Sequence, residues 1–384
     1  MRSDGGETEK AMRTFWAVTM LAGALLGGRA NAACTSPLAD ETIRLPGRPF
    51  AAEPSPDNCH LFVSLIGNHG GSVAVLDNDQ GQFRLGRVVP LPQGSGGGVA
   101  LSHDGKLLAV AAEDAIALLD IAKLETDTQD PIVGLLPDAG HGAIYTALTK
   151  DDAYVFVSEE RNATVAVIDV AALHAGSSKA VVGRVEVGQA PVGLALSPDG
   201  TILFSTSEVA GQGDDCQPEQ ARGRPHAQGA LFTIDVAKAI TDPSHAVTGA
   251  MRAGCNPVRV VVAGDGHALW VSARGDGRII GLDPAIFSSG ERKGQTVALA
   301  VGKSPVGLAL RPDGTQLWVA DSDRFARTGG SLVQITPLGP AAAQVAQTFE
   351  TGAFPRDLRF LPDGKTLVVA LFGDSAVLLH PTDR

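Results

Sequence analysis

The stretch Val187-Gly-Gln-Ala-Pro-Val-Gly-Leu-Ala-Leu-Ser-Pro-Asp-Gly200 decides how this chain folds. It opens with Gly188 and Pro191, continues as a short apolar run and ends in a Pro-Asp-Gly turn. A second apolar run, residues 201–206, follows at once. Two short apolar runs joined by such a turn predict a β-hairpin.

The same unit recurs along the chain, and the turn aspartate marks each copy. The seven matching positions are Asp57, Asp104, Asp151, Asp199, Asp265, Asp313 and Asp363. Neighbouring copies lie 47 to 66 residues apart. A period of about 45 residues, rich in β-branched runs and without helical periodicity, is typical of four-stranded propeller blades.

The last copy shows only three strand-like runs, at residues 357–361, 366–371 and 375–379. The segment 42–47 precedes the first copy at the spacing of the missing fourth strand. We therefore predict an all-β chain that forms a single seven-bladed β-propeller of four-stranded blades. In this fold the N-terminal strand completes the last blade and leaves only short sheet edges.

Two stretches carry a resemblance to a known family. Residues 154–169, Tyr-Val-Phe-Val-Ser-Glu-Glu-Arg-Asn-Ala-Thr-Val-Ala-Val-Ile-Asp, and residues 187–200 resemble the repeat of the YVTN, or YncE-like, β-propellers. This WD40/YVTN repeat-like group borders on the seven-bladed lactonase-like propellers. The resemblance covers about residues 41 to 384 and implies the fold. It implies little about activity, because the matching residues are the structural ones.

Residues 1–32 have the pattern of a secretory signal peptide. Arg13 precedes an apolar run at residues 15–26, and Ala30 and Ala32 supply the small residues of a cleavage site. The run is too short to span a membrane. Because acidic residues precede Met12, we expect Met12 to be the true start. Residues 33–384 would then form a periplasmic or secreted propeller with no membrane attachment after cleavage.

Four cysteines in an exported chain predict two disulfides. The ring of blades has a turn face, which carries the Pro-Asp-Gly turns, and a top face, which carries the loops between the second and third strands. The order of strands places Cys34 and Cys59 at the turn face, and Cys216 and Cys255 at the top face. We therefore predict the pairs Cys34–Cys59 and Cys216–Cys255, since the other pairings would join opposite faces.

Composition excludes several classes of function. The formal net charge is −11 and only 5% of residues are aromatic, which disfavours nucleic acid and anionic membranes as partners. Haem, zinc and Walker motifs are absent from the sequence, so we expect no cofactor and no resident metal. Asp77 opens a stretch that resembles half a calcium loop. An aspartate recurs, however, at the end of the third strand in five blades: Asp77, Asp120, Asp169, Asp235 and Asp283. This recurrence favours a structural role in the turn for Asp77 over calcium binding.

Positions that break the repeat are the best candidates for a functional site. Six residues before each turn aspartate, on the innermost strand, four blades carry Gly or Ala and three carry Tyr145, Arg259 and Asp357. Nine residues after the turn aspartate, on the top face, blades two to five carry Glu113, Glu160, Glu208 and Arg274. An insertion at residues 211–228 adds His226 to the same face.

We infer a top-face pocket for a small polar or anionic ligand, or for a protein partner. Arg259 and Arg356 would hold a carboxylate or carbonyl oxygen through paired N–H donors. The other predicted ligand-binding residues are Tyr145, Arg274, Asp357 and His226. The leading hypothesis is a monomeric binding or scaffold protein.

Three alternatives stay open. A lactonase-like hydrolase would use Glu160 or Glu208 as general base and His141 or His226 as proton shuttle. An accessory subunit of a periplasmic redox enzyme would use the same face to bind its partner. In a purely structural interpretation, Arg259 and Asp357 form an ion pair that plugs the axis of the ring. A metal at Glu113, Glu160 and Glu208 is a weaker possibility.

Overall fold

The computed structural model describes residues 34–68, 70–92, 94–126, 129–137, 140–211, 216, 227–284, 295–324, 329–338 and 342–383. The predicted signal peptide, residues 1–32, lies outside them. Within the described residues, no helix is long and apolar enough to cross a membrane.

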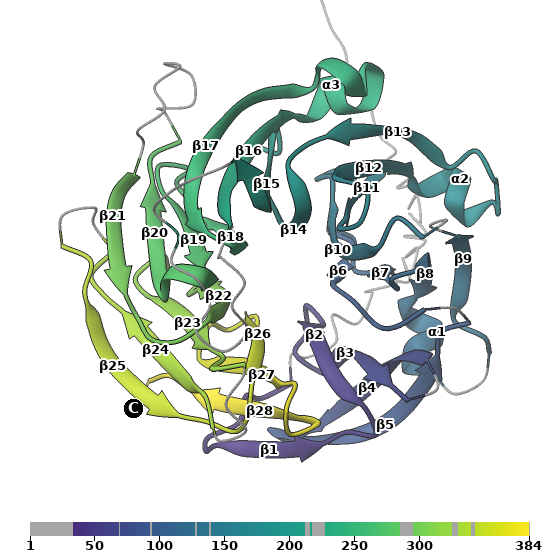
Figure 1. Cartoon of the computed structure of the whole chain (residues 1–384). Helices are drawn as coiled ribbons and strands as arrows, with labels where there is room; N and C mark the ends of the chain where they lie inside the picture. Colours follow the sequence, from purple (N-terminus) through teal and green to yellow (C-terminus); the bar gives the residue numbers. More distant parts are fainter. Residues whose placement is uncertain are drawn as a thin grey trace, which may run out of the picture. The chain divides into compact units, whose positions relative to one another are not determined.

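Seven four-stranded antiparallel sheets follow one another around a ring (Figure 1). Blade one contains β2 (Arg48–Pro54), β3 (His60–Gly67), β4 (Gly70–Asp79) and β5 (Gln82–Pro90). Blade two contains β6 (Val99–Leu101), β7 (Leu107–Ala111), β8 (Ala115–Asp120) and β9 (Ile132–Pro137). Blade three contains β10 (Ala143–Leu148), β11 (Tyr154–Glu159), β12 (Thr164–Asp169) and β13 (Val181–Glu186).

The later blades repeat this order. Blade four contains β14 (Gln189–Leu196), β15 (Ile202–Gly211), β16 (Gln228–Asp235) and β17 (Val247–Cys255). Blade five contains β18 (Pro257–Val262), β19 (Leu269–Ala273), β20 (Arg278–Leu282) and β21 (Gln295–Ala300). Blade six contains β22 (Pro305–Leu310), β23 (Leu317–Asp321), β24 (Ser331–Ile335) and β25 (Val345–Glu350).

Blade seven is closed by the N-terminal strand, as predicted. Its sheet contains β26 (Pro355–Phe360), β27 (Thr366–Leu371), β28 (Ala376–Pro381) and β1 (Glu41–Arg44). β1 pairs antiparallel with β28, from Glu41 opposite Leu379 to Arg44 opposite Ala376. The prediction of an all-β, seven-bladed propeller is therefore confirmed.

Three short helices follow the third strands of blades two, three and four. They are α1 (Ile121–Glu125), α2 (Val170–His174) and α3 (Val236–Thr241). The recurring aspartates Asp120, Asp169 and Asp235 cap these helices by accepting a backbone N–H three residues on. The described residues also form two 3₁₀ turns, η1 (Pro243–His245) and η2 (Arg274–Asp276). In blades two, three and four this column of aspartates is thus structural, because it caps helices there.

The turn aspartates are held by local hydrogen bonds. Asp104 accepts from the Lys106 side chain and backbone N–H and from Ser102, which lowers the pKa of its carboxyl to about 2. Asp199 accepts from Ser197 and from the Thr201 backbone and hydroxyl, which also lowers its pKa to about 2. Such bonds favour the ionised form and fix the turn.

The residue after each turn aspartate lies in the left-handed region. Five blades use Gly there, with φ between 69° and 76°, whereas Asn58 has φ 62° and Asp152 has φ 57°. Both are residue types that tolerate this conformation.

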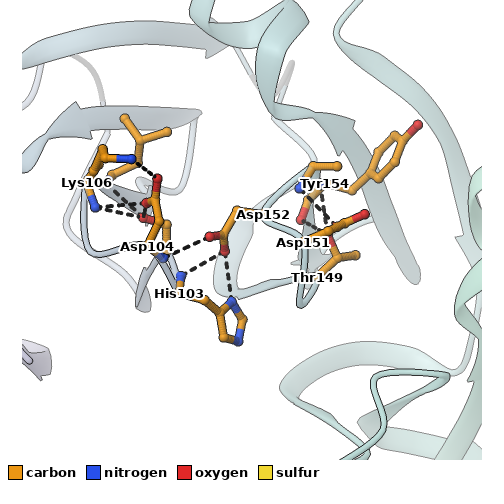
Figure 2. A network of polar contacts seen from close by, with 10 residues as sticks. His103, Asp104, Lys106, Thr149, Asp151, Asp152 and Tyr154 are labelled. Atoms are coloured by element: carbon orange, nitrogen blue, oxygen red, sulfur yellow. Dashed lines mark hydrogen bonds and ion pairs between the residues drawn. The ribbon is translucent and has the colours of Figure 1, made fainter. Parts of the chain in front are cut away.

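The Asp152 side chain links two turns, as Figure 2 shows. Its carboxylate accepts hydrogen bonds from the His103 backbone N–H at 2.8 Å, from the His103 ring Nδ1 at 2.8 Å and from the Asp104 N–H at 3.0 Å. Asp152 therefore ties the turn of blade three to that of blade two.

Both predicted disulfides are present, Cys34–Cys59 and Cys216–Cys255. The first joins the segment before β1 to the turn of blade one, and the second joins the blade-four insertion to the end of β17. Two structural disulfides indicate a non-cytoplasmic protein.

The innermost strands share one irregularity that positions the site. In six blades the pairing of the first strand with the second shifts register near the top face. A β-bulge of this kind re-aims the side chains at the shift. The shifts fall between Ala143 and Tyr145, between Pro257 and Val260, and between Pro355 and Asp357. The broken-repeat residues thus lie at the bulges.

Candidate binding site on the top face

Tyr145, Arg259 and Asp357 meet across the axis of the ring; we call them the axial cluster. The Arg259 Nε lies 3.6 Å from the Asp357 Oδ1, and the guanidinium carbon of Arg259 lies 4.2 Å from the centre of the Tyr145 ring. The Tyr145 hydroxyl donates to the Asp357 Oδ1 at 3.3 Å. The three residues come from blades three, five and seven, so the cluster links alternate blades.

Small residues in the intervening blades make room for the cluster. A Cβ added to Gly98 would lie 2.5 Å from the Tyr145 Cδ2, and one added to Gly193 would lie 3.0 Å from the Arg259 Cα. One added to Gly307 would lie 3.1 Å from the Asp357 Cα. Small and large residues therefore alternate around the axis because each glycine faces the backbone or ring of the next blade.

Arg259 is the least satisfied charged group of the cluster. Only 4% of the residue is exposed, and none of its three side-chain nitrogens has a hydrogen-bond acceptor among the described residues. Asp357 is 2% exposed, and its Oδ2 is likewise without a donor in that part of the chain. Buried polar atoms normally form hydrogen bonds. The unpartnered atoms of Arg259 and Asp357 therefore mark an exceptional position in the fold.

Arg359 lies next to the cluster on β26. It donates to the Tyr145 hydroxyl at 2.9 Å and to the Glu53 carboxylate at 3.1 Å. Burial opposes its charge, but Tyr145, Asp357 and Glu53 outweigh burial and raise its pKa. Burial raises the pKa of Glu53, against the opposing effect of Arg359. The Arg359–Glu53 pair links blade seven to blade one. Its charged groups have hydrogen-bond partners, whereas the side-chain nitrogens of Arg259 have none among the described residues.

Arg356 is half-buried among phenylalanines. Its guanidinium carbon lies 3.9 Å from the centre of the Phe50 ring, 5.3 Å from Phe372 and 5.8 Å from Phe354. Arg356 was predicted from the sequence as a ligand-binding residue, whereas the three phenylalanine rings around it were not. A signal was available: seven residues before the turn aspartate, blades four, five and six carry valines that pack together, and Phe50 and Arg356 break this column.

The charge of Arg356 is disfavoured by its surroundings. Burial lowers the pKa of its guanidinium to about 9, and the neighbouring guanidiniums of Arg259, Arg324 and Arg274 add to the effect. Asp357 opposes them only in part. Four guanidiniums therefore gather at the top end of the axis of a protein whose formal net charge is −11.

Glu160, Glu208 and Arg274 surround this end of the axis. Arg274 donates to the Glu208 carboxylate at 2.8 Å. Burial of its carboxyl and the charge of Glu208 raise the pKa of Glu160, although the residue as a whole is exposed; Arg356, Arg274 and Arg161 oppose the rise. Glu113 pairs instead with Arg161 and accepts from the Ser95 hydroxyl.

No described residues form a convincing metal site here. Among them, one group of three ligand-type side chains lies close enough together, Cys216, Cys255 and Asp276, and its cysteines form a disulfide. The glutamates predicted as a weaker metal alternative are paired with arginines or surrounded by them.

The structure places His141 elsewhere. Its Nδ1 lies 3.1 Å from the Arg184 Nη2 and 3.5 Å from the Glu159 Oε1. Arg184 belongs to β13, the outermost strand of blade three, so His141 lies toward the rim of the ring. His226 lies outside the described residues. Of the nine predicted catalytic and ligand-binding residues, seven share electrostatic or direct contacts at the axis: Tyr145, Glu160, Glu208, Arg259, Arg274, Arg356 and Asp357.

One further carboxyl on the top face is unusual. Asp321, at the end of β23, accepts the Lys303 N–H at 2.8 Å, but its Oδ1 has no donor among the described residues. The residue is 8% exposed, and burial raises its pKa to about 7, aided by Asp323.

Comparisons with known proteins define the fold class. No family model matches the chain, and no curated protein matches it. A chain of hydrazine synthase from Kuenenia stuttgartiensis is similar in structure, with a TM-score of 0.66 and 18% sequence identity over 88% of this chain and 96% of that one. In all, 1484 solved chains share such similarity, so the likeness shows the fold and does not select an activity. The protein is a disulfide-bonded, seven-bladed β-propeller.

Proposed function

We propose that this protein is an exported YVTN/YncE-like propeller that binds a small anionic ligand at the top end of the ring axis. One observation carries the proposal: the Arg259 guanidinium is 4% exposed, and its nitrogens have no hydrogen-bond acceptor among the described residues. A carboxylate would supply two acceptors in the geometry that a guanidinium prefers.

The surrounding charges support an anion as ligand. Arg259 and Arg274 lie close enough to Arg356 for each to disfavour the charge of its guanidinium. An anion between them would relieve this repulsion. The phenyl rings around Arg356 hold its guanidinium in place before a ligand arrives, which reduces the entropy lost on binding.

Binding can be measured by isothermal titration calorimetry of the purified protein with acetate, malonate, citrate and gluconate. Arg356→Met removes the charge and keeps an apolar side chain against Phe50. We expect it to weaken binding by about tenfold or more. Arg252→Met is the matched control, because Arg252 is exposed on the outer strand β17. Absence of binding across the panel, or equal binding by the Arg356 variant, would contradict the proposal.

A lactonase-like hydrolase is the second candidate, and the raised pKa of Glu160 favours it. A carboxyl that titrates closer to neutral pH can act as general base on water. Arg356 would then bind the lactone carbonyl. In this candidate Glu160 is the base to test first, since Glu208 is paired with Arg274 and His141 with Arg184.

The hydrolase candidate is tested by titrating released acid at constant pH with sugar and aliphatic lactones. Glu160→Gln should abolish turnover while ligand binding persists. Turnover that survives this substitution would exclude Glu160 as the base. The accessory-subunit hypothesis stays a prediction, because a likeness at 18% identity concerns the fold alone.

A further inference from the structure

A cavity of about 340 Å³ lies between blades six and seven. Arg311 and Gln316, which flank the turn aspartate Asp313, belong to its lining, so it lies near the turn face and away from the axial cluster. Its inner lining combines three carboxamides with three rings: Gln316, Gln334, Gln347, Trp318, Phe349 and His380.

The strand register of blade six explains this lining. Trp318 on β23 stands opposite Gln334 on β24, and Gln334 stands opposite Gln347 on β25. Residues directly opposite one another across antiparallel strands project from the same face of the sheet. The three adjacent strands therefore present an indole and two carboxamides together toward blade seven.

Gln334 occupies a position that carries Thr233 in blade four, Gly281 in blade five and an aliphatic residue in the other four blades. The aliphatic residues, each opposite the fifth residue after the turn aspartate, are Val75, Leu118, Val167 and Leu379. Gln334 is only 8% exposed and lines the cavity. Burying an amide costs free energy unless it finds hydrogen-bond partners, and an aliphatic residue fills this position in four other blades.

His380 breaks a second column. The other six blades carry Leu or Ile there: Leu76, Leu119, Ile168, Ile234, Leu282 and Ile335. His380 is 7% exposed, its Nδ1 lies 3.0 Å from the Asp40 Oδ1, and its ring meets Phe349 and Trp318 edge-on at 5.0 and 5.6 Å. Gln334 and His380 thus face the same cavity from neighbouring blades.

The charged groups of the lining are already paired. Asp40 lies against His380, and Arg311 lies 3.2 Å from Asp313 and 2.6 Å from Asp383. The Gln316 amide oxygen already accepts the Trp318 Nε1–H at 3.0 Å. The groups left to a ligand are the amides of Gln334 and Gln347, which both donate and accept, and the half-buried Phe349 ring. This combination suits a neutral molecule with many hydroxyls and an apolar C–H face.

We propose that the cavity between blades six and seven binds a neutral sugar ring. Gln334 and Gln347 would hydrogen-bond its hydroxyls, and Phe349 would contact its C–H face. The volume is at the lower end of the range for small-molecule sites, which fits one ring and no longer chain. This inference is independent of anion binding at the axis.

The probes are glucose, galactose, mannose and N-acetylglucosamine, titrated by calorimetry. In a Trp270→Phe background, Trp318 is the remaining tryptophan between residues 34 and 383, and its fluorescence should change on binding. Gln334→Leu restores the residue of blades two and seven, and so should fold. We expect it to weaken sugar binding by about tenfold or more.

Gln189→Leu, an exposed glutamine at the start of β14, is the matched control and should bind as the unmodified protein does. Arg356→Met should also leave sugar binding unchanged, which separates this site from the anion site. No binding of any of the four sugars at millimolar concentration would overturn the proposal. Equal affinity in Gln334→Leu would overturn it as well.

Discussion

The two faces of the ring use charged residues in opposite ways. On the turn face, aspartates recur in every blade, and hydrogen bonds lower the pKa values of Asp104 and Asp199 to about 2. At the top end of the axis, the charges Arg259, Arg356 and Asp357 on the innermost strands each occur in a single blade. There, burial leaves Arg259 without acceptors, lowers the pKa of Arg356 to about 9 and raises that of Asp321 to about 7.

This difference shows how a repeat protein separates structure from candidate function. A charge that recurs is satisfied by its own blade, because the same local turn supplies the same donors each time. A charge that occurs once depends on partners from other blades, and it can stay incompletely paired. Substitutions on the two faces should therefore differ in the size and the pH dependence of their effects.

The largest effect is expected at the axis. Asp357→Leu leaves the Arg259 guanidinium buried without its carboxylate, and should lower the free energy of unfolding by about 3–5 kcal/mol. Urea denaturation measures the change. The double variant Arg259→Met, Asp357→Leu should recover most of the loss, since an apolar pair can replace a buried ion pair. A double variant as unstable as the single one would show that the ion pair is not the source.

The second effect is a pH dependence of opposite sign on the two faces. Because the folded pKa of Asp321 is about 7 and the unfolded value is about 4, the native state holds a proton that the unfolded state has lost between these values. This residue therefore makes stability fall as pH rises from about 4 to 7. Asp321→Asn should remove the fall and stabilise the protein at pH 8 but not at pH 4, as measured by urea denaturation at each pH.

Asp199→Asn is the matched comparison on the turn face. Its folded pKa of about 2 lies below the unfolded value, so its contribution is present above about pH 4 and is lost as pH falls toward 2. The substitution should lower stability above pH 4, and its effect should shrink as pH falls toward 2. Parallel pH profiles for the two variants would contradict the contrast between the faces.

The smallest effect is expected at the link between two turns. Asp152→Gly keeps the left-handed conformation but removes the acceptor of the His103 and Asp104 N–H groups (Figure 2). We expect a loss of about 1–2 kcal/mol in thermal or urea unfolding. Asp152→Asn, which retains an acceptor and tolerates φ 57°, should lose less. An equal loss in both variants would show that the negative charge, and not the acceptor, matters.

The sequence by itself determined the fold, the seven blades, their closure by an N-terminal strand and both disulfides. These features depend on local patterns: a turn of four residues, short apolar runs, and a spacing that repeats. Because each blade forms its sheet largely from consecutive residues, the pattern of one repeat predicts the strands of the other blades. The same logic showed which aspartates are structural.

Only the tertiary structure decided which of the broken-repeat residues meet. Tyr145 and Asp357 are 212 residues apart in sequence, and closure of the ring alone brings them within 3.3 Å. The sequence singled out Arg356, but it did not give the neighbours of that side chain in the next blade. It also gave no direction for His141, which lies toward Arg184 at the rim. A repeat fixes the height of a side chain on its blade, whereas packing between blades decides what that side chain contacts.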